Sequence, residues 1–320
     1  SIIALYLDGI FALQSGVIDN SSLETLVDIF QKNHKEAIVT YLCESILEDS
    51  PNNLFALRTL AASYFAENNE KVWDFYAKIV KIDFEEAELA KVLADHYLEQ
   101  GDTDLGREYL KKAILRYIKI MNYNATKDMW TRLVQEIPTE IDFFQLVRRK
   151  IAKTFGEIKT TTLMQELYAW YKDNQKWDIA IDILKQNLNI EPKDSWARKE
   201  ITDCFRGKYA THSHLEDYIK SSNLTQSYRN IFEAINDFEK HIAFDKGSFV
   251  FHRSWNVGRI KELKNDTLII NFGRHGIKEM SLKIAISALQ PLDKTHIWVV
   301  KATTKSSDKE KLVAKIKNEK

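Results

Sequence analysis

Apolar side chains recur every three to four residues through most of the chain, which is the spacing of amphipathic helices. The clearest case is residues 84–119, where two apolar stripes are separated by Gly101. Ala94 and Gly106 are small residues at positions where the two helices must cross closely. The stripes consist of Leu89, Val92, Leu93 and Tyr97, and then of Tyr109, Leu110, Ala113, Ile114, Tyr117 and Ile118. The segment predicts a helix–turn–helix unit of about 34 residues.

The same arrangement recurs before and after this unit. The triplet Leu60, Ala61 and Tyr64 precedes the triplet Leu93, Ala94 and Tyr97 by 33 residues. A further unit runs over residues 167–188 and ends before Pro192, and Pro51 lies at the corresponding seam of the earlier unit. Proline cannot continue a helix but is tolerated in its first turn, so it suits a seam between units. These helix pairs resemble tetratricopeptide repeats.

Other segments show helical spacing without the repeat pattern. They are residues 22–30, 35–47, 127–136, 140–153 and 216–243. Each unit has an apolar stripe that it cannot bury alone, so neighbouring units must stack to form the core. The predicted fold class is therefore mainly α, with residues 1–244 forming a tetratricopeptide-like α-solenoid. We expect its groove to hold a peptide or protein partner, although a single aromatic side chain there is by default core packing.

The period changes from helical to alternating near residue 245. Four short strands bounded by turn residues are predicted over residues 247–252, 256–263, 267–272 and 277–280. Ser281 is a suitable N-cap for one or two helical turns that end before Pro291. Residues 296–300 are predicted to form a further strand or a docking segment. Residues 245–300 should therefore fold as a small β-barrel.

The zero net charge of the 320 residues conceals an asymmetry. Residues 245–320 contain 16 basic and 8 acidic residues, whereas residues 1–244 contain 30 basic and 38 acidic residues. The chain is thus an acidic body with a basic end, and the two parts should prefer different partners. Residues 301–320 are polar and rich in Lys, which indicates a connector or tail. The chain has only 10 Gly and 4 Pro, which disfavours a fold made mostly of short strands.

The basic end resembles SH3-like and Tudor-like modules and, more narrowly, the polymerase-interacting module of CarD-type transcription regulators. The resemblance is carried by Val250, His252, Val257, Gly258, Arg259 and Ile260, while Asn256 stands where that family usually has its first glycine. With the helical repeats before it and SLKIAISALQPLDKTHIWVVKA after it, the chain resembles the N-terminal extension of long Gre-type bacterial transcription elongation factors. That resemblance implies a chain that binds RNA polymerase. Any transcript-cleavage chemistry would belong to a Gre unit outside it.

The candidate binding residues lie in or beside the predicted strands of the basic end. They are Arg253, Trp255, Arg259, Lys261, Arg274, His275 and Lys278. Arg and Lys can contact phosphates of DNA or RNA, and an exposed aromatic ring can stack on a base or pack on a protein. In the alternative interpretation, Trp255 completes the barrel core and the basic residues form a solvated face. With the CarD-like resemblance, the same surface would instead dock on RNA polymerase.

Nothing in the sequence nominates an enzyme, a cofactor site or a metal site. The glycine-based phosphate-binding and nucleophile motifs are absent from it. His212, His214 and Cys204 have no known metal-site spacing, and a polar loop between helices is the simpler explanation for the histidines. Cys43 and Cys204 lie far apart and outside any CxxC pair, so we expect buried, reduced thiols in a cytoplasmic protein.

The sequence predicts no membrane partner. No apolar run approaches the length of a membrane span, and the first ten residues lack the basic region of a signal peptide. Ser rather than Met at position 1 suggests an excised fragment.

Three functions are compatible with these patterns. The first is the non-catalytic, polymerase-associated part of a Gre-like elongation factor. The second is a general peptide-binding scaffold unrelated to transcription. The third is direct binding of DNA or RNA by the basic end, with an affinity that falls steeply as salt is added.

Overall fold

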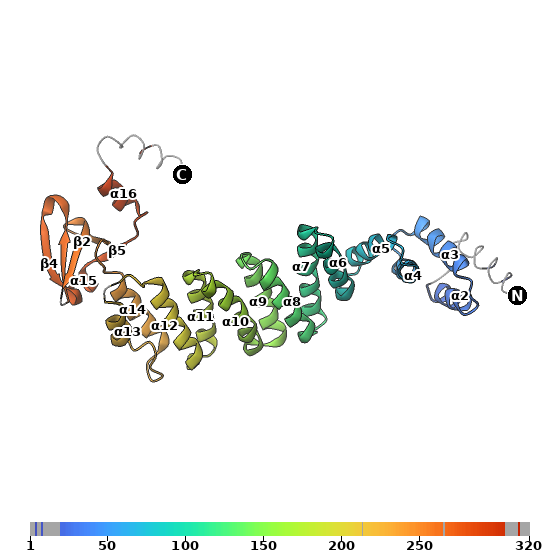
Figure 1. Ribbon diagram of the computed structural model, residues 1–320, viewed down its shortest axis with the longest axis horizontal. Helices are drawn as coiled ribbons and strands as arrows, with labels where there is room; N and C mark the ends of the chain where they lie inside the picture. Colours follow the sequence, from blue (N-terminus) through green and yellow to red (C-terminus); the bar gives the residue numbers. More distant parts are fainter. Residues whose placement is uncertain are drawn as a thin grey trace. The chain divides into compact units, whose positions relative to one another are not determined.

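The computed structural model describes residues 20–304 apart from residues 213 and 265, together with the isolated residues Ala4, Asp8 and Val313. The chain divides into two compact units, Ser1–Trp170 and Tyr171–Lys320. The described strands all lie in the second unit (Figure 1). The change from helices to strands near residue 245 is thus present. The division into domains at residues 1–244, 245–300 and 301–320 stays a prediction.

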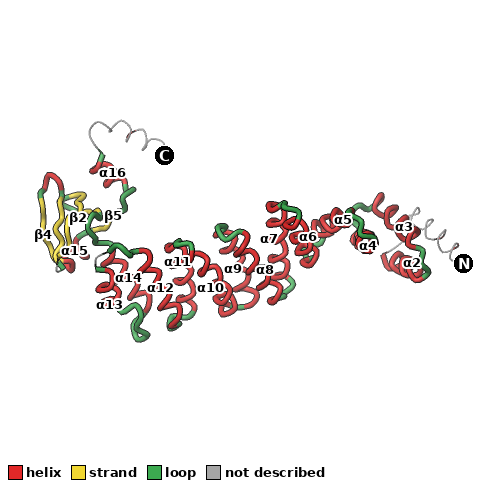
Figure 2. The backbone as a smooth tube through the Cα atoms, in the orientation of Figure 1, coloured by secondary structure: helices red, strands yellow, loops and turns green. Residues whose placement is uncertain are grey.

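Helices of the first unit follow one another as pairs joined by short turns (Figure 2). They are α2 (Asn20–Lys32), α3 (Glu36–Asp49), α4 (Leu54–Ala66), α5 (Lys71–Ile82), α6 (Ala87–Glu99), α7 (Thr103–Lys119), α8 (Tyr123–Glu136) and α9 (Ile141–Phe155), while α10 (Glu157–Asp173) runs into the second unit. Each helix pair expected from the sequence before α10 is present, with ends shifted by a few residues. The prediction of a mainly α fold is confirmed. None of the described helices is long and apolar enough to cross a membrane.

Side-chain caps explain where several of these helices begin. The side chain of Asn53 accepts a hydrogen bond from the N–H of Ala56 at 3.0 Å, and Asp102 and Asn122 cap α7 and α8 in the same way. Such a cap stabilises a helix by about 1 kcal/mol. At the end of α6, Gly101 has a φ of 82°, a left-handed conformation that glycine adopts without a steric penalty.

The crossing of α6 and α7 is as close as its small residues predict. A β-carbon on Gly106 would lie 2.7 Å from Cγ of Leu98, so a larger residue would push the two helices apart. Ala94 is fully buried in the same pair. His96 stacks on Trp73 with ring centroids 3.7 Å apart, so both rings contribute to packing between helices.

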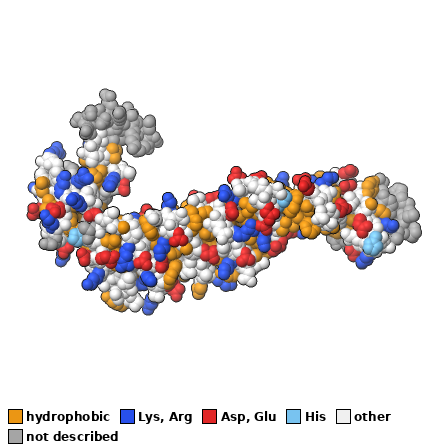
Figure 3. Space-filling view, in the orientation of Figure 1, with side chains coloured by type: hydrophobic (Ala, Val, Ile, Leu, Met, Phe, Trp, Pro, Cys, Tyr) orange, Lys and Arg blue, Asp and Glu red, His pale blue; other side chains and the backbone are white. Residues whose placement is uncertain are grey.

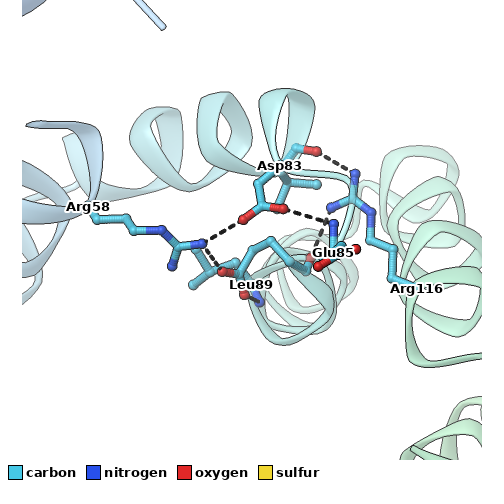
Figure 4. A network of polar contacts seen from close by, with 7 residues as sticks. Arg58, Asp83, Glu85, Leu89 and Arg116 are labelled. Atoms are coloured by element: carbon cyan, nitrogen blue, oxygen red, sulfur yellow. Dashed lines mark hydrogen bonds and ion pairs between the residues drawn. The ribbon is translucent and has the colours of Figure 1, made fainter. Parts of the chain in front are cut away.

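A polar network joins α4, α7 and the turn between α5 and α6 (Figure 4). Arg58 contacts the carboxylates of Asp83 at 2.9 Å and Glu86 at 2.6 Å. Arg116 is buried and donates to the backbone carbonyls of Glu86 and Val80. Burial lowers the pKa of Arg116, and the carboxylates of Asp83 and Glu86 oppose that shift. The network therefore fixes how consecutive helix pairs stack.

Four further helices complete the helical part of the second unit. They are α11 (Trp177–Ile190), α12 (Ser195–Lys208), α13 (Leu215–Ser222) and α14 (Ile231–Ile242). The sequence pattern predicts all of them except α12. In α12 the side chain of Arg198 is only 3% exposed and donates to the carbonyls of Pro192, Gln226 and Arg229 at 2.9, 2.8 and 3.0 Å. A buried arginine interrupts the apolar stripe, so the pattern does not reveal this helix.

The strands form a five-stranded antiparallel sheet in the order β4-β3-β2-β1-β5. They are β1 (Phe249–His252), β2 (Asn256–Lys264), β3 (Thr267–Asn271), β4 (Ile277–Ser281) and β5 (Gln290–Leu292), accompanied by the short helices η1 (Gly273–His275), α15 (Leu282–Ala288) and α16 (Ile297–Thr303). The four predicted strands are confirmed. So are the helical turns after Ser281, whose side chain accepts from the N–H of Ile284 at 3.4 Å. The small antiparallel module expected from the sequence is therefore present.

The sheet packs around a small apolar core. Its buried side chains are Val250, Ile260, Leu268, Ile270 and Phe272, joined by Leu282 and Ala285 of α15. A β-carbon on Gly258 would lie 2.6 Å from the ring of Phe272, so only glycine fits on β2 there. The last strand, β5, returns to pair with β1. Among the described residues β4 and β5 do not pair with each other, so these strands form an open sheet.

Two features at the end of the module differ from the sequence prediction. The prediction of a strand over residues 296–300 is wrong, because helix α16 begins there. The side chain of His296 accepts a hydrogen bond from the N–H of Trp298 at 3.2 Å and caps this helix. Strand β5 is missed because it contains Pro291, which cannot donate to a strand ladder. β5 lies at the edge of the sheet, which is where proline is tolerated.

A cationic and aromatic groove as the candidate binding site

Trp255 lies in the turn between β1 and β2, where His252 orients it. The backbone N–H groups of Ser254 and Trp255 donate to Nδ1 of His252 at 3.2 and 3.3 Å. The indole and imidazole rings are stacked with centroids 4.0 Å apart, and the ring of Phe272 lies 5.3 Å from the indole. Asn256 closes the turn with a φ of 60°, a left-handed conformation in which asparagine is enriched. His252, one of the residues behind the CarD-like resemblance, thus positions Trp255.

Arg274 and His275 are presented by the turn between β3 and β4. The side chain of Asn271 accepts from the N–H of Gly273 at 2.9 Å, and Gly273 and Gly276 have left-handed φ values of 61° and 75°. Arg274 is exposed, and His275 is half-buried. Nε2 of His275 has no hydrogen-bond partner among the described residues. The turn therefore offers the exposed guanidinium of Arg274 to a ligand, whereas Nε2 of His275 is itself buried.

Helix α16 supplies a further wall. The ring of Trp298 lies 4.4 Å from that of Phe251 on β1, yet 44% of Trp298 stays exposed. Together with the two turns, α16 encloses a pocket of about 810 Å³. Its lining residues are Phe251, Trp255, Asn256, Val257, Phe272, Gly273, Arg274, His275, Trp298, Lys301 and Ala302.

A smaller pocket of about 230 Å³ adjoins the first, because both are lined by Val257, Gly273 and Ala302. Its other lining residues are Phe249, Gly258, Arg259, Lys261, Asn271 and Thr303. We call the two pockets together the α16 groove. Its volume is ample for several side chains or a nucleotide.

The structure brings most of the predicted site residues together in this groove. Trp255, Arg274 and His275 line the larger pocket, and Arg259 and Lys261 line the smaller one. Trp255 both packs on the module and lines the pocket, so each of the two interpretations describes part of its surroundings.

Two predicted residues lie outside the groove. Lys278 on β4 places Nζ 5.5 Å from the ring centroid of Trp255. Arg253 is exposed in the β1–β2 turn and lines neither pocket. Sequence reasoning also missed Phe251, Trp298 and Lys301. The alternation of β1 contained the signal for Phe251, but Trp298 and Lys301 join the site only because α16 is a helix.

The electrostatics of the groove are dominated by cations. Residues 245–304 contain ten basic and five acidic side chains, and Figure 3 shows Lys and Arg over the strand module. Among the described residues the sheet contains one ion pair, between Lys264 and Glu262 at 2.9 Å, and it involves no groove residue. The groove therefore combines uncompensated positive charge with aromatic faces, which suits carboxylates or phosphates attached to a flat or apolar group.

The two histidines near α13 and Cys204 have separate surroundings in the described part of the chain. His212 is buried, with Nε2 3.9 Å from a carboxylate oxygen of Asp245, and Cys204 is fully buried. Burial lowers the pKa of His212, Asp245 opposes that shift, and His214 reinforces it. No group of three or more potential ligands that could hold a metal occurs among the described residues. Cys43 is buried as expected, and burial raises the pKa of its thiol to about 11.

The chain is similar over its whole length to two curated proteins. One is the GreA-associated domains protein of Treponema pallidum (strain Nichols), which is 49% identical over 319 residues. The other is the transcription elongation factor GreA of Borreliella burgdorferi, which is 30% identical over 320 residues. The chain spans 48% of the first protein and 35% of the second. No protein-family model matches the chain.

Among solved structures, the chain is similar to the TPR-like repeats of a kinesin light chain from Podosopora anserina. That similarity has a TM-score of 0.27 and 18% identity, and covers 54% of this chain and 95% of that one.

Proposed function

We propose that this chain is the non-catalytic part of a Gre-like transcription elongation factor and that it binds RNA polymerase through the α16 groove. The observation that carries the proposal is the similarity of the entire chain, groove included, to two proteins whose names refer to GreA. The CarD-like resemblance around His252 supports the same partner. The pairing of β5 with β1 in a small five-stranded antiparallel sheet supports an SH3-like module. The proposal implies a cytoplasmic protein.

The composition of the groove supports a protein partner. Trp and Arg dominate the residues that contribute most to protein interfaces, and they tend to gather at the centre of the contact. Here Trp255 and Trp298 line the same pocket as Arg274, and Arg259 follows in the adjoining pocket. A polymerase surface that carries carboxylates next to an apolar side chain would satisfy both kinds of residue.

In this proposal the helical repeats hold other protein partners. Stacked helix pairs build long surfaces of the kind that peptides and helices bind. Several large apolar side chains remain exposed on them, such as Phe65 at 62% and Phe84 at 68%.

The test measures binding of the full chain to core RNA polymerase of the same organism by biolayer interferometry. The variant Arg259→Glu/Arg274→Glu places two negative charges in the groove and should weaken binding at least tenfold, about 1.4 kcal/mol. The matched control Lys81→Glu/Lys127→Glu changes two exposed lysines on α5 and α8 and should bind as the wild type does. Equal affinities of the groove variant and the wild type would refute the proposal.

The uncompensated cations also favour a second candidate, direct binding of DNA or RNA. Each phosphate contact adds nearly one unit to the slope of log affinity against log salt. Binding of a single-stranded oligonucleotide with a steep salt slope, lost in Arg259→Glu/Arg274→Glu and combined with no binding to polymerase, would favour this candidate. The remaining alternative is a general peptide-binding scaffold. It requires that the groove variant and the wild type have the same affinity for polymerase and the same affinity for nucleic acid.

A further inference from the structure

A second cationic pocket lies in the first unit, where the ends of α7 and α9 meet. Its volume is about 550 Å³. It is lined by Leu115, Ile118, Lys119, Met121, Lys150, Lys153 and Thr154, and we call it the α7–α9 pocket. The floor is apolar and the remaining lining includes three lysines. This combination stands out in the acidic body, where acidic residues outnumber basic ones.

Met121 is held in a conformation that its side chain does not favour. It follows the last turn of α7 with a φ of 57°, and its N–H donates to the carbonyl of Ile118 at 3.1 Å. Left-handed backbone costs a residue with a β-carbon about 1 kcal/mol, and a bulky residue there is an outlier. The turns that follow α2, α4, α6 and α10 use His34, Asn68, Gly101 and Gln175 in the same conformation. Met121 is also 68% exposed, so burial does not repay the strain.

The lysines are only partly explained by the fold. Lys119 and Lys153 lie in the last turns of α7 and α9, where a cation interacts favourably with the helix dipole. Lys119 also contacts Glu85 at 3.2 Å. Lys150 lies further from the end of α9, and among the described residues neither Lys150 nor Lys153 has an ion-pair partner. Two ammonium groups therefore border the apolar floor without a carboxylate.

A further cation lies over an aromatic pair that joins α8 and α9. The rings of Tyr123 and Phe155 lie 5.3 Å apart and join the start of α8 to the end of α9. Nζ of Lys159 lies over the Tyr123 ring at 4.5 Å. Tyr123 and Phe155 follow Met121 and Thr154 closely in sequence, but neither they nor Lys159 line the pocket itself.

We propose that the α7–α9 pocket binds an acidic, amphipathic segment of a partner protein. The segment would place a large apolar side chain between Leu115, Ile118 and Met121. Flanking Asp or Glu residues would pair with Lys150 and Lys153. The lysines favour an acidic occupant by charge complementarity. The apolar floor requires that this occupant also carry an apolar side chain. The proposal does not depend on the α16 groove or on RNA polymerase.

The test selects a phage-displayed library of random 12-residue peptides on the full chain and measures the best peptide by fluorescence anisotropy. Selected peptides should carry two or more Asp or Glu next to Leu, Phe or Met. The variant Lys150→Glu/Lys153→Glu should weaken binding about tenfold or more, with weaker binding also at high salt. The variant Arg259→Glu/Arg274→Glu in the α16 groove should bind the peptide as the wild type does.

The variant Met121→Gly gives a more specific test, because it should not destabilise the folded chain. Glycine suits the left-handed backbone, so the free energy of unfolding should stay level or rise, while peptide affinity falls about three- to tenfold. The matched control Asn68→Gly relieves the same backbone conformation elsewhere and should leave affinity unchanged. The proposal is overturned if no peptide is enriched, if enriched peptides lack acidic residues, or if Lys150→Glu/Lys153→Glu binds them as well as the wild type.

Discussion

Cations in the helical part of the molecule and cations in the α16 groove have different surroundings. In the helices, Arg58 contacts two carboxylates, Lys111 contacts Glu140 at 2.5 Å, and Arg206 contacts Glu216 at 2.8 Å. In the α16 groove, no ion pair is found among the described residues for the cations that line it. These three helical cations therefore help to hold elements together, whereas the groove cations have no such task within the module.

The aromatic side chains show the same difference. In the helices, the rings of Trp73 and His96 stack between neighbouring elements, and those of Tyr97 and Tyr109 stack with centroids 5.6 Å apart. In the strand module, Trp298 packs on the rings of Phe251 and His296 and still leaves 44% of its surface exposed. The comparison teaches that a residue type alone does not reveal its role. A side chain whose partner group already lies within the chain serves the fold, whereas a side chain without such a partner can serve binding.

The largest effect is expected for a buried cation of the helices. Arg198→Met removes a buried guanidinium that donates to three carbonyl groups, so three charge-assisted hydrogen bonds are lost. We expect the free energy of unfolding to fall by about 3 kcal/mol, measured by urea denaturation. Arg198→Lys keeps the charge, but its ammonium group cannot reach all three carbonyls. Its free energy of unfolding should therefore lie between those of the wild type and Arg198→Met. An unchanged midpoint for Arg198→Met would show that this arginine does not hold the helices together.

The next largest effects are expected for two glycines, one in the strand module and one in the helices. Gly258→Ala on β2 would place a β-carbon against Phe272, so we expect a loss of about 2 kcal/mol and weaker binding in the α16 groove. Gly106→Ala on α7 meets Leu98 in the same way and should cost a similar amount. It should leave groove binding unchanged, because it lies in the first unit. Loss of groove binding in both variants, measured below their unfolding temperatures, would contradict this separation.

A smaller effect concerns pH and the second unit. Burial lowers the pKa of His212, although the carboxylate of Asp245 opposes this shift. The folded state therefore favours the neutral imidazole. This stabilisation is complete above about pH 6.5, the ordinary pKa of histidine, and is lost as pH falls through the lower pKa of the folded state. The unfolding temperature should therefore drop between pH 7 and pH 5. In His212→Gln the drop should be smaller, and an identical drop would assign the pH dependence to other groups.

The sequence predicted the helix pairs and the first four strands because both kinds of element bury an apolar face with a regular period. It missed α12, where buried Arg198 interrupts the stripe, and β5, where Pro291 argues against a strand. In the candidate site, the sequence identified the cations and Trp255 by residue type. It could not place Trp298 and Lys301 in the groove, because that depends on α16 being a helix capped by His296 and packed on β1. It also gave no sign of the α7–α9 pocket, whose residues come from helices separated in the chain.

The smallest effects compare exposed cations directly. Arg259→Ala/Arg274→Ala removes two groove cations without ion-pair partners in the described part of the chain, so the free energy of unfolding should change by less than about 0.5 kcal/mol. Arg58→Ala/Lys111→Ala removes two paired cations of the helices and should cost about 1 kcal/mol, because partly exposed ion pairs contribute a few tenths to one kcal/mol each. Both double variants are compared by urea denaturation at low and at high salt. Salt should reduce the cost in the helical variant by screening the pairs that it removes. If the groove variant were as destabilised as the helical one, the groove cations would serve the fold, and their exposure would no longer argue for a partner.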